Sequence, residues 1–371
     1  MYVNKSSFLE LNRRKFLGAA ASALALPVTG SLPALGSDTS LAIGMANSVM
    51  TVTYPYITTS LAHGFFEEEG VNVDVVMGQN SSQILSLLAG GTVDLVFCNP
   101  EPVIQLAADK NVPVKSVFVV LVAQYILTVP EGSPIQTVKD LKGKRIGMAS
   151  PVSGIDYLKA RLMDEGMSVD DIEIVPTGFG GQTIEAVKQG QVDAIMYWSD
   201  ALALFRYSGL ELRNLPKADW EQGLYQYVAA TRQDVIDTKP EALKRALRAM
   251  ARSQMLSVVS PKATIDAFWK QYPDQAPKAG EEEAAFGQAL ARVRQQNTVI
   301  GIESNPSRET IMSHQWGKQE LSSWDRMQEN LLRVGSLKNK VDPATLFDDQ
   351  FSAYANDFDR EQIYELAAAA E

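Results

Sequence analysis

The amino-acid sequence predicts an α/β protein built from two similar lobes with a ligand cleft between them. One pattern of residues occurs twice, at 43–102 and at 146–201. Each copy begins with Ile-Gly-Met-Ala and later contains Gly-x-Val-Asp, at 91–94 and at 190–193. In both copies strand-like apolar runs alternate with helix-like runs, which favours parallel βαβ units. The length of 371 residues also exceeds what one hydrophobic core usually supports, and a cleft between domains is a preferred position for a small ligand.

The elements of the first copy follow from local patterns. Ile57, Leu61 and Phe65 recur at helical spacing, and Ser81 or Ser82 can cap a later helix. The predicted order is a strand at 41–46, a helix at 54–66, a strand at 71–77, a helix that ends at 89 and a strand at 95–98. The β-rich run at 114–129 is interpreted as the passage from the first lobe into the second.

The second copy repeats this order, and a mostly helical region follows it. Ser153 can cap a helix at 155–165, and another helix is expected to end near residue 207. A strand at 224–229 then returns to the first lobe. The alanine- and arginine-rich stretch at 240–259 has the pattern of a long amphipathic helix.

The N-terminal residues have the layout of an export signal. In residues 1–36 a basic patch with Arg13 and Arg14 precedes a short apolar run and small residues. We expect cleavage near Gly36 and a periplasmic protein, and the adjacent arginines resemble a twin-arginine signal. The rest of the chain is assigned to lobe I (37–123 plus 229–371, with the C-terminal helices) and to lobe II (124–228).

Composition excludes several classes of function. The formal net charge is −10, and it becomes −13 without the net +3 of residues 1–36, so binding to nucleic acid or to an anionic membrane through charge is not expected. Cys98 is the single cysteine, and His63 and His314 are the only histidines. We therefore expect no internal disulfide, no metal site and no cofactor.

Candidate binding residues lie in the loops that follow the predicted strands, because ligands of open α/β sheets bind beyond the carboxyl ends of the strands. The aromatic candidates are Tyr54, Tyr56, Tyr125, Phe179, Tyr197 and Trp198. The polar candidates are Asn47, Ser81, Ser82, Gln83, Asn99, Glu101, Ser153, Gly154, Gln182 and Asp200. Each aromatic residue could instead pack in a core. Each serine could serve only as a helix cap, and Glu101 could be a solvated acid at a helix start.

Several motifs resemble the solute-binding proteins of nitrate/sulfonate/taurine-type ABC importers, including those for pyrimidine precursors of thiamine. The most specific is His-Gly-Phe-Phe-Glu-Glu-Glu-Gly-Val-Asn-Val at 63–73. Further matches lie at 91–94, 133–135, 140–144, 190–193, 324–335 and 341–347. The resemblance implies a monomeric periplasmic binding protein of type II. Such a protein closes its lobes on one small solute and delivers it to an inner-membrane permease.

The same resemblance includes an enzyme, the pyrimidine synthase of thiamine biosynthesis, whose cysteine-rich motif and histidine iron ligands this chain lacks. The chain is therefore expected to bind and not to catalyse. The candidate loops hold no Lys or Arg but contain Glu101, Asp156 and Asp200. This favours a flat neutral or cationic nitrogen compound, such as an aminopyrimidine that donates to Glu101. Aliphatic sulfonate, taurine, nitrate or an aromatic carboxylate stays open, because helix N-termini also bind anions.

Overall fold

The computed structural model describes residues 39–122, 125–152, 154–303 and 305–370. The predicted export signal, its cleavage site and the candidate Ser153 lie outside these residues. None of the helices in the described ranges has the length and apolar character needed to cross a membrane.

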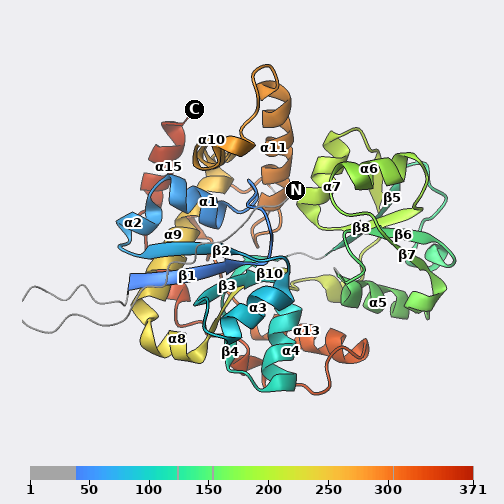
Figure 1. Ribbon diagram of the computed structural model, residues 1–371, viewed down its shortest axis with the longest axis horizontal. Coiled ribbons are helices and arrows are strands. Elements are labelled where there is room, and N and C mark those ends of the chain that lie inside the picture. Colours follow the sequence, from blue (N-terminus) through green and yellow to red (C-terminus); the bar gives the residue numbers. More distant parts are fainter. Residues whose placement is uncertain (1–38, 123–124, 153, 304, 371) are drawn as a thin grey trace, which may run out of the picture. The chain divides into compact units, whose positions relative to one another are not determined.

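The first sheet has the strand order β2-β1-β3-β10-β4 (Figure 1). Its strands are β1 (Ser40–Met45), β2 (Asn72–Met77), β3 (Leu95–Cys98), β4 (Val114–Leu121) and β10 (Tyr227–Arg232). The strands β1, β2 and β3 are parallel, and β10 runs antiparallel to both β3 and β4.

The second sheet has the equivalent order β7-β6-β8-β5-β9. Its strands are β5 (Ile126–Pro130), β6 (Arg145–Met148), β7 (Glu173–Pro176), β8 (Ala194–Tyr197) and β9 (Leu212–Asn214). The strands β6, β7 and β8 are parallel, and β5 runs antiparallel to β8 and β9. In each sheet one antiparallel strand lies directly beside the three parallel strands: β10 in the first sheet and β5 in the second. Each of these two strands follows a segment in which the chain crosses from one lobe to the other. The two sheets confirm the predicted two-lobed α/β fold, whereas the exact domain boundaries stay a prediction.

Helices connect and cover the two sheets (Figure 1). Those before the return strand are α1 (Pro55–Ala62), α2 (Phe65–Glu68), α3 (Ser81–Ala89), α4 (Pro100–Lys110), α5 (Ile155–Asp164), α6 (Gly181–Lys188) and α7 (Ser199–Tyr207). Those after it are α8 (Gln233–Thr238), α9 (Pro240–Val259), α10 (Pro261–Gln271), α11 (Glu282–Asn297), α12 (Arg308–Ser313), α13 (Leu321–Arg333), α14 (Ser352–Ala355) and α15 (Arg360–Ala368). Two C-terminal helices also contact the second lobe, since α11 packs on α7 and α13 packs on α5.

The repeated aspartate has the same structural role in both lobes. The carboxylate of Asp94 accepts the backbone N–H of Ala42 at 3.0 Å, and the carboxylate of Asp193 accepts that of Arg145 at 2.8 Å. Each aspartate therefore ties the turn after a helix to a parallel strand of its own sheet, β1 in the first lobe and β6 in the second. The internal repeat found in the sequence is thus a repeat of structure.

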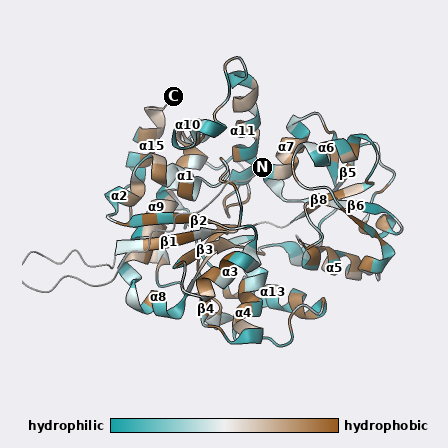
Figure 2. Cartoon of the chain, in the orientation of Figure 1, coloured by the Kyte–Doolittle hydropathy of each residue, from teal (hydrophilic) through white to brown (hydrophobic). Residues whose placement is uncertain are grey.

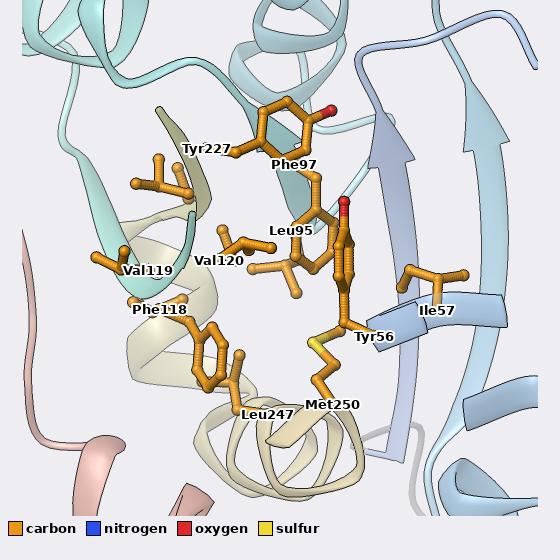
Figure 3. Close-up of a cluster of buried hydrophobic side chains, with 14 of the residues drawn as sticks. Tyr56, Ile57, Leu95, Phe97, Phe118, Val119, Val120, Tyr227, Leu247 and Met250 are labelled. Atoms are coloured by element: carbon orange, nitrogen blue, oxygen red, sulfur yellow. The ribbon is translucent and has the colours of Figure 1, made fainter. Parts of the chain in front are cut away.

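The hydrophobic core follows the sheets, whose central strands β3 and β8 are mainly apolar (Figure 2). In the first lobe, Tyr56, Phe97 and Phe118 pack with Leu247 and Met250 of α9 (Figure 3). The long helix α9 is buried over most of its length, and its bounds confirm the predicted helix at 240–259. This helix is buried mainly by α1, α10, α14 and α15, and its burial contributes hydrophobic stabilisation to the first lobe.

Three local expectations were wrong. The helix predicted at 54–66 is divided into α1 and α2, because Gly64 has a left-handed conformation with φ of +73°. Neither Ser81 nor Ser82 caps α3, since Asn80 occupies the N-cap and its side chain accepts the N–H of Gln83. The N-cap position of α5 belongs to Gly154.

Candidate functional site

Tyr54 lies on the first-lobe side of the predicted cleft. It occupies the N-cap position of α1, and its hydroxyl accepts a hydrogen bond from the side chain of Asn47. Its ring stacks on that of Tyr227 with centroids 6.4 Å apart and planes 5° apart. Burial raises the pKa of Tyr54, and the negative charge of Asp200 on the second lobe raises it further. Tyr54 therefore faces the second lobe.

The second lobe contributes a group of aromatic side chains. Phe179 stacks on Trp198 with centroids 5.5 Å apart, and Trp198 meets the edge of Tyr125 at 6.4 Å. Gly154 has φ of +73°, and a Cβ atom there would lie 2.7 Å from Cδ2 of Tyr125. Glycine is thus required at this position, because it allows the first turn of α5 to approach the Tyr125 ring.

A basic residue that the sequence analysis did not select completes this group. Arg292 on α11 donates to Oδ2 of Asp200 from Nη2 at 2.9 Å and from Nε at 3.3 Å. Its guanidinium carbon also lies 5.9 Å from the centroid of the Phe179 ring, within cation–π range. The side chains of Asp200 and Arg292 are 6% and 15% exposed. We call Tyr54, Tyr125, Phe179, Trp198, Asp200 and Arg292 the interlobe cluster.

A pair of carboxyl groups lies beside this cluster. Glu101 is in the first turn of α4, and Asp156 is in the first turn of α5. Burial and the negative charge of Asp156 raise the pKa of Glu101 to about 7, although its own backbone N–H lowers it. Asp156 in turn accepts a hydrogen bond from the hydroxyl of Ser336 at 2.5 Å. Glu101 can therefore present either a proton or a negative charge near neutral pH.

Among the described residues, some buried polar atoms near Tyr54 have no hydrogen-bond partner. They are the hydroxyls of Tyr56 and Tyr227 and the side-chain oxygen of Gln226. The Tyr227 hydroxyl is near Asn47 and the backbone of Ala46, but the geometry makes a hydrogen bond with neither. Both tyrosine oxygens lie at the end of the apolar cluster away from α9 (Figure 3). Buried polar groups usually have partners, so these atoms can receive a ligand or water.

The other candidates are less closely associated with the interlobe cluster. The Ser81 hydroxyl donates to the Asn99 side chain and accepts the Asn99 N–H, both at 3.1 Å. Asn99 then donates to the backbone oxygen of Gln226 at 3.2 Å, which links this pair to the return strand. Ser82, Gln83 and Gln182 are exposed, and the oxygen of Gln83 accepts the local N–H of Gln79. Tyr197 is buried and bonds with Thr177 and Thr183, so it serves the core of the second lobe.

Sequence reasoning therefore missed three residues near the candidate site. Tyr227 and Gln226 lie at the return strand, which was predicted as an element but not searched for ligand contacts. Arg292 lies outside both copies of the repeat, and no local motif marks it. The candidate loops hold no Lys or Arg, and the basic group beside them comes from α11, which lies outside those loops.

The described residues also line a separate, partly open pocket of about 400 Å³. It is lined by Val119, Val122, Gly223, Tyr225, Ile300, Gly301, Ser313, His314, Gln315, Gly317, Lys318, Glu320 and Ser323. None of these residues belongs to the candidate loops, so the pocket is distinct from the interlobe cluster. No group of three or more His, Cys, Asp or Glu side chains in the described chain is arranged to hold a metal ion.

The two lobes share one strand order, and aromatic and acidic groups lie between them. This architecture is the fold of the periplasmic binding proteins. The chain belongs to the NMT1/THI5-like family, whose model matches residues 54–264. It is 23% identical over 291 residues to the formylaminopyrimidine-binding protein of Halalkalibacterium halodurans, covering 75% of this chain and 86% of that protein.

Two further relatives show the range of proteins with this fold. The periplasmic aliphatic sulphonate binding protein SsuA of Escherichia coli superposes with a TM-score of 0.60 and 18% identity, over 84% of this chain and 92% of that chain. The 4-amino-5-hydroxymethyl-2-methylpyrimidine phosphate synthase of Aspergillus parasiticus is 23% identical over 238 residues, covering 58% of this chain and 65% of that protein. The relatives are thus mostly binding proteins, but they include an enzyme.

Proposed function

We propose that this protein is the periplasmic solute-binding component of an ABC importer and that it captures a small aminopyrimidine-like solute between its lobes. The observation that carries the proposal is the pairing of charges around the interlobe cluster. Arg292 is paired with Asp200, and Asp156 with Lys159 at 3.5 Å, whereas no basic side chain of the described residues is a cause of the pKa shift of Glu101. The excess charge is negative, which favours a neutral or cationic ligand.

The residues suit a flat heterocycle. Tyr54, Tyr125 and Trp198 offer ring faces and edges for stacking. Glu101 would accept a hydrogen bond from an exocyclic amine, and protonated Glu101 would donate to a ring nitrogen. Gly154 lies against the Tyr125 ring. Two residues later, the charge of Asp156 raises the pKa of Glu101. The start of α5 therefore lies next to both the aromatic and the acidic groups. The formylaminopyrimidine-binding relative agrees with this solute class.

A second candidate solute is an aliphatic sulfonate. Arg292 favours it, because a guanidinium group is well suited to a sulfonate, and SsuA has the same fold. To bind directly, a sulfonate would have to displace Asp200 from Arg292. We therefore rank this solute class below the pyrimidine.

We also propose that the protein does not transform its ligand. Cys98, the one thiol, is fully buried, and burial raises its pKa, so it is a poor nucleophile. The proposal is tested by incubating the purified protein with 4-amino-5-hydroxymethyl-2-methylpyrimidine, releasing the bound compound by denaturation and measuring its mass. An unchanged mass, with a smaller radius of gyration on binding, supports capture by lobe closure. A changed mass would assign the protein to the enzymes of the family.

Export through the twin-arginine route remains part of the proposal. Cell fractionation and N-terminal sequencing test it, with a mature periplasmic chain that begins near Ser37 as the expected result. Replacement of Arg13 and Arg14 by lysine should retain the precursor in the cytoplasm. An intact Met1 chain in the cytoplasm of wild-type cells would contradict export.

A further inference from the structure

We infer that the ion pair between Asp200 and Arg292 determines which sign of ligand charge the site accepts, because Asp200 occupies the guanidinium edge that an anionic ligand would otherwise bind. This inference rests on the proposed function, since it assigns a charge preference to the same site. It makes Asp200 and Arg292 specificity-determining residues.

The geometry of the pair supports this role. Both donors of Arg292, Nε and Nη2, point at a single oxygen of Asp200, at 3.3 and 2.9 Å. This is the edge of the guanidinium with which arginine usually holds a carboxylate or sulfonate. Asp200 is 4% exposed as a residue, so the pair is shielded from the solvent that screens surface ion pairs. A ligand anion must therefore compete with a carboxylate that is already in place.

The pair belongs to the predicted ligand site and not to the outer surface. Asp200 raises the pKa of Tyr54 and Arg292 lowers it, so both charges act on a side chain of the first lobe. Arg292 also lies over the ring of Phe179, which stacks on Trp198. A ligand between Tyr54 and Trp198 would be exposed to both charges.

The helix that carries Arg292 contacts both lobes, through α10 and α9 in the first lobe and through α7 in the second. Tyr207 on α7 donates from its hydroxyl to the backbone oxygen of Ala284 at 3.0 Å. The same hydroxyl would clash with a Cβ atom at Gly287, so the absence of a side chain there allows α11 and α7 to approach. Because α11 lies outside both repeats, this chain adds its basic group to the site from a separate element.

The test changes the charge at the site and compares ligands of different charge. The probes share a 4-amino-2-methylpyrimidine ring and carry aminomethyl, hydroxymethyl or carboxylate at position 5; butanesulfonate represents the other solute class. Affinities are measured by calorimetry for the wild type, Asp200→Asn, Arg292→Gln and the double variant. Arg333→Gln is the control, because Arg333 of α13 forms a more exposed pair with Asp164 at 2.6 Å and also reaches the second lobe. Thermal unfolding confirms that each variant is folded.

The expected result depends on the sign of the ligand charge. Asp200→Asn frees Arg292 and should tighten carboxylate or butanesulfonate binding by about tenfold or more relative to the hydroxymethyl probe. Arg292→Gln should shift preference towards the aminomethyl cation by a similar factor, and the double variant should return the wild-type order. Arg333→Gln should change all probes equally.

The outcomes distinguish this inference from the proposed function. Equal weakening of all probes by Asp200→Asn and Arg292→Gln would show that the pair only holds the lobes together, and it would overturn the inference. If no pyrimidine binds the wild type but Asp200→Asn gains butanesulfonate binding, the pyrimidine proposal fails and the inference stands. Tight butanesulfonate binding to the wild type that Asp200→Asn leaves unchanged would overturn both.

Discussion

The rings of Tyr54 and Tyr56 lie with centroids 6.0 Å apart and planes tilted by 51°, but their hydroxyls differ. Tyr54 receives a hydrogen bond from Asn47, whereas the buried hydroxyl of Tyr56 has no hydrogen-bond partner among the described residues. An unpaired buried hydroxyl costs about 1–3 kcal/mol of stability. Such a cost is tolerated where the group has a function, which makes the Tyr56 hydroxyl a candidate ligand contact.

Replacement of Tyr56 by phenylalanine tests this contact. We expect the ligand-free protein to gain about 1 kcal/mol of unfolding free energy, because the unpaired hydroxyl is removed, while ligand affinity falls several-fold. Urea denaturation and calorimetry measure the two effects. Tyr364→Phe is the matched control, since its hydroxyl on α15 is also buried and unpaired; it should gain stability and leave affinity unchanged. Unaltered affinity in Tyr56→Phe would remove that hydroxyl from the site.

The protonation of Glu101 predicts a pH dependence of binding. Its pKa is raised to about 7, so an increasing fraction of the carboxyl becomes ionised as the pH rises from 6 to 8. A cationic or donor ligand should then bind more tightly, and an anion more weakly. Calorimetry across this range with the wild type and Glu101→Gln measures the effect, and the substitution should flatten the profile. A slope retained in Glu101→Gln would assign the titration to another group.

The raised pKa of Glu101 also predicts how the stability of the ligand-free protein depends on pH. A carboxyl whose folded pKa is raised binds its proton more tightly when folded, so the stabilisation is complete below the ordinary pKa of 4.5. It is lost as the pH rises through about 7. Thermal unfolding should therefore show a decrease in stability between pH 5 and pH 8 that is smaller in Glu101→Gln. An equal decrease in both proteins would contradict this assignment.

A buried ion pair holds the segment that leads from the second lobe towards the return strand. Glu221 accepts hydrogen bonds from Arg161 and Tyr157 and from the N–H of Ala218, and both charged residues are 6% exposed. Glu221→Gln leaves Arg161 without its counter-charge and should cost about 3 kcal/mol or more. Denaturant unfolding measures this loss of stability. Glu361→Gln removes the exposed pair with Arg308 and should cost less than about 1 kcal/mol; equal costs would show that Glu221 is not tightly paired.

Asp193, the repeated aspartate of the second lobe, makes a contribution to folding stability that depends on pH. The hydrogen bond from Arg145 holds the pKa of Asp193 below its usual range, so its stabilisation is present above the ordinary pKa and is lost as the pH falls. Asp193→Asn should lower stability by about 1 kcal/mol at pH 7, because the pair is partly exposed. The difference from the wild type should disappear near pH 3. A difference that persists there would mean that the substitution disturbs packing instead.

The sequence predicted the parts of the molecule that depend on local patterns. The duplicated Gly-x-Val-Asp motif, the strand β3 and the helix α9 follow from apolar periodicity and turn residues, which act over a few positions. The break at Gly64 depends on one glycine in a left-handed conformation, which sequence spacing alone does not reveal. The pairing of Arg292 with Asp200 depends on how α11 folds back on α7, and no local rule encodes that contact.

The central claim is that the lobes capture a neutral or cationic nitrogen heterocycle and not an anion. Calorimetric titration of the wild-type protein at pH 7 with 4-amino-5-hydroxymethyl-2-methylpyrimidine and with butanesulfonate tests it most directly. The account predicts tight binding of the pyrimidine, reduced at least tenfold by Glu101→Gln, because the amide cannot become the carboxylate acceptor that a donor ligand favours. It predicts much weaker binding of the sulfonate. Tight sulfonate binding that survives Glu101→Gln, with no detectable pyrimidine binding, would contradict it.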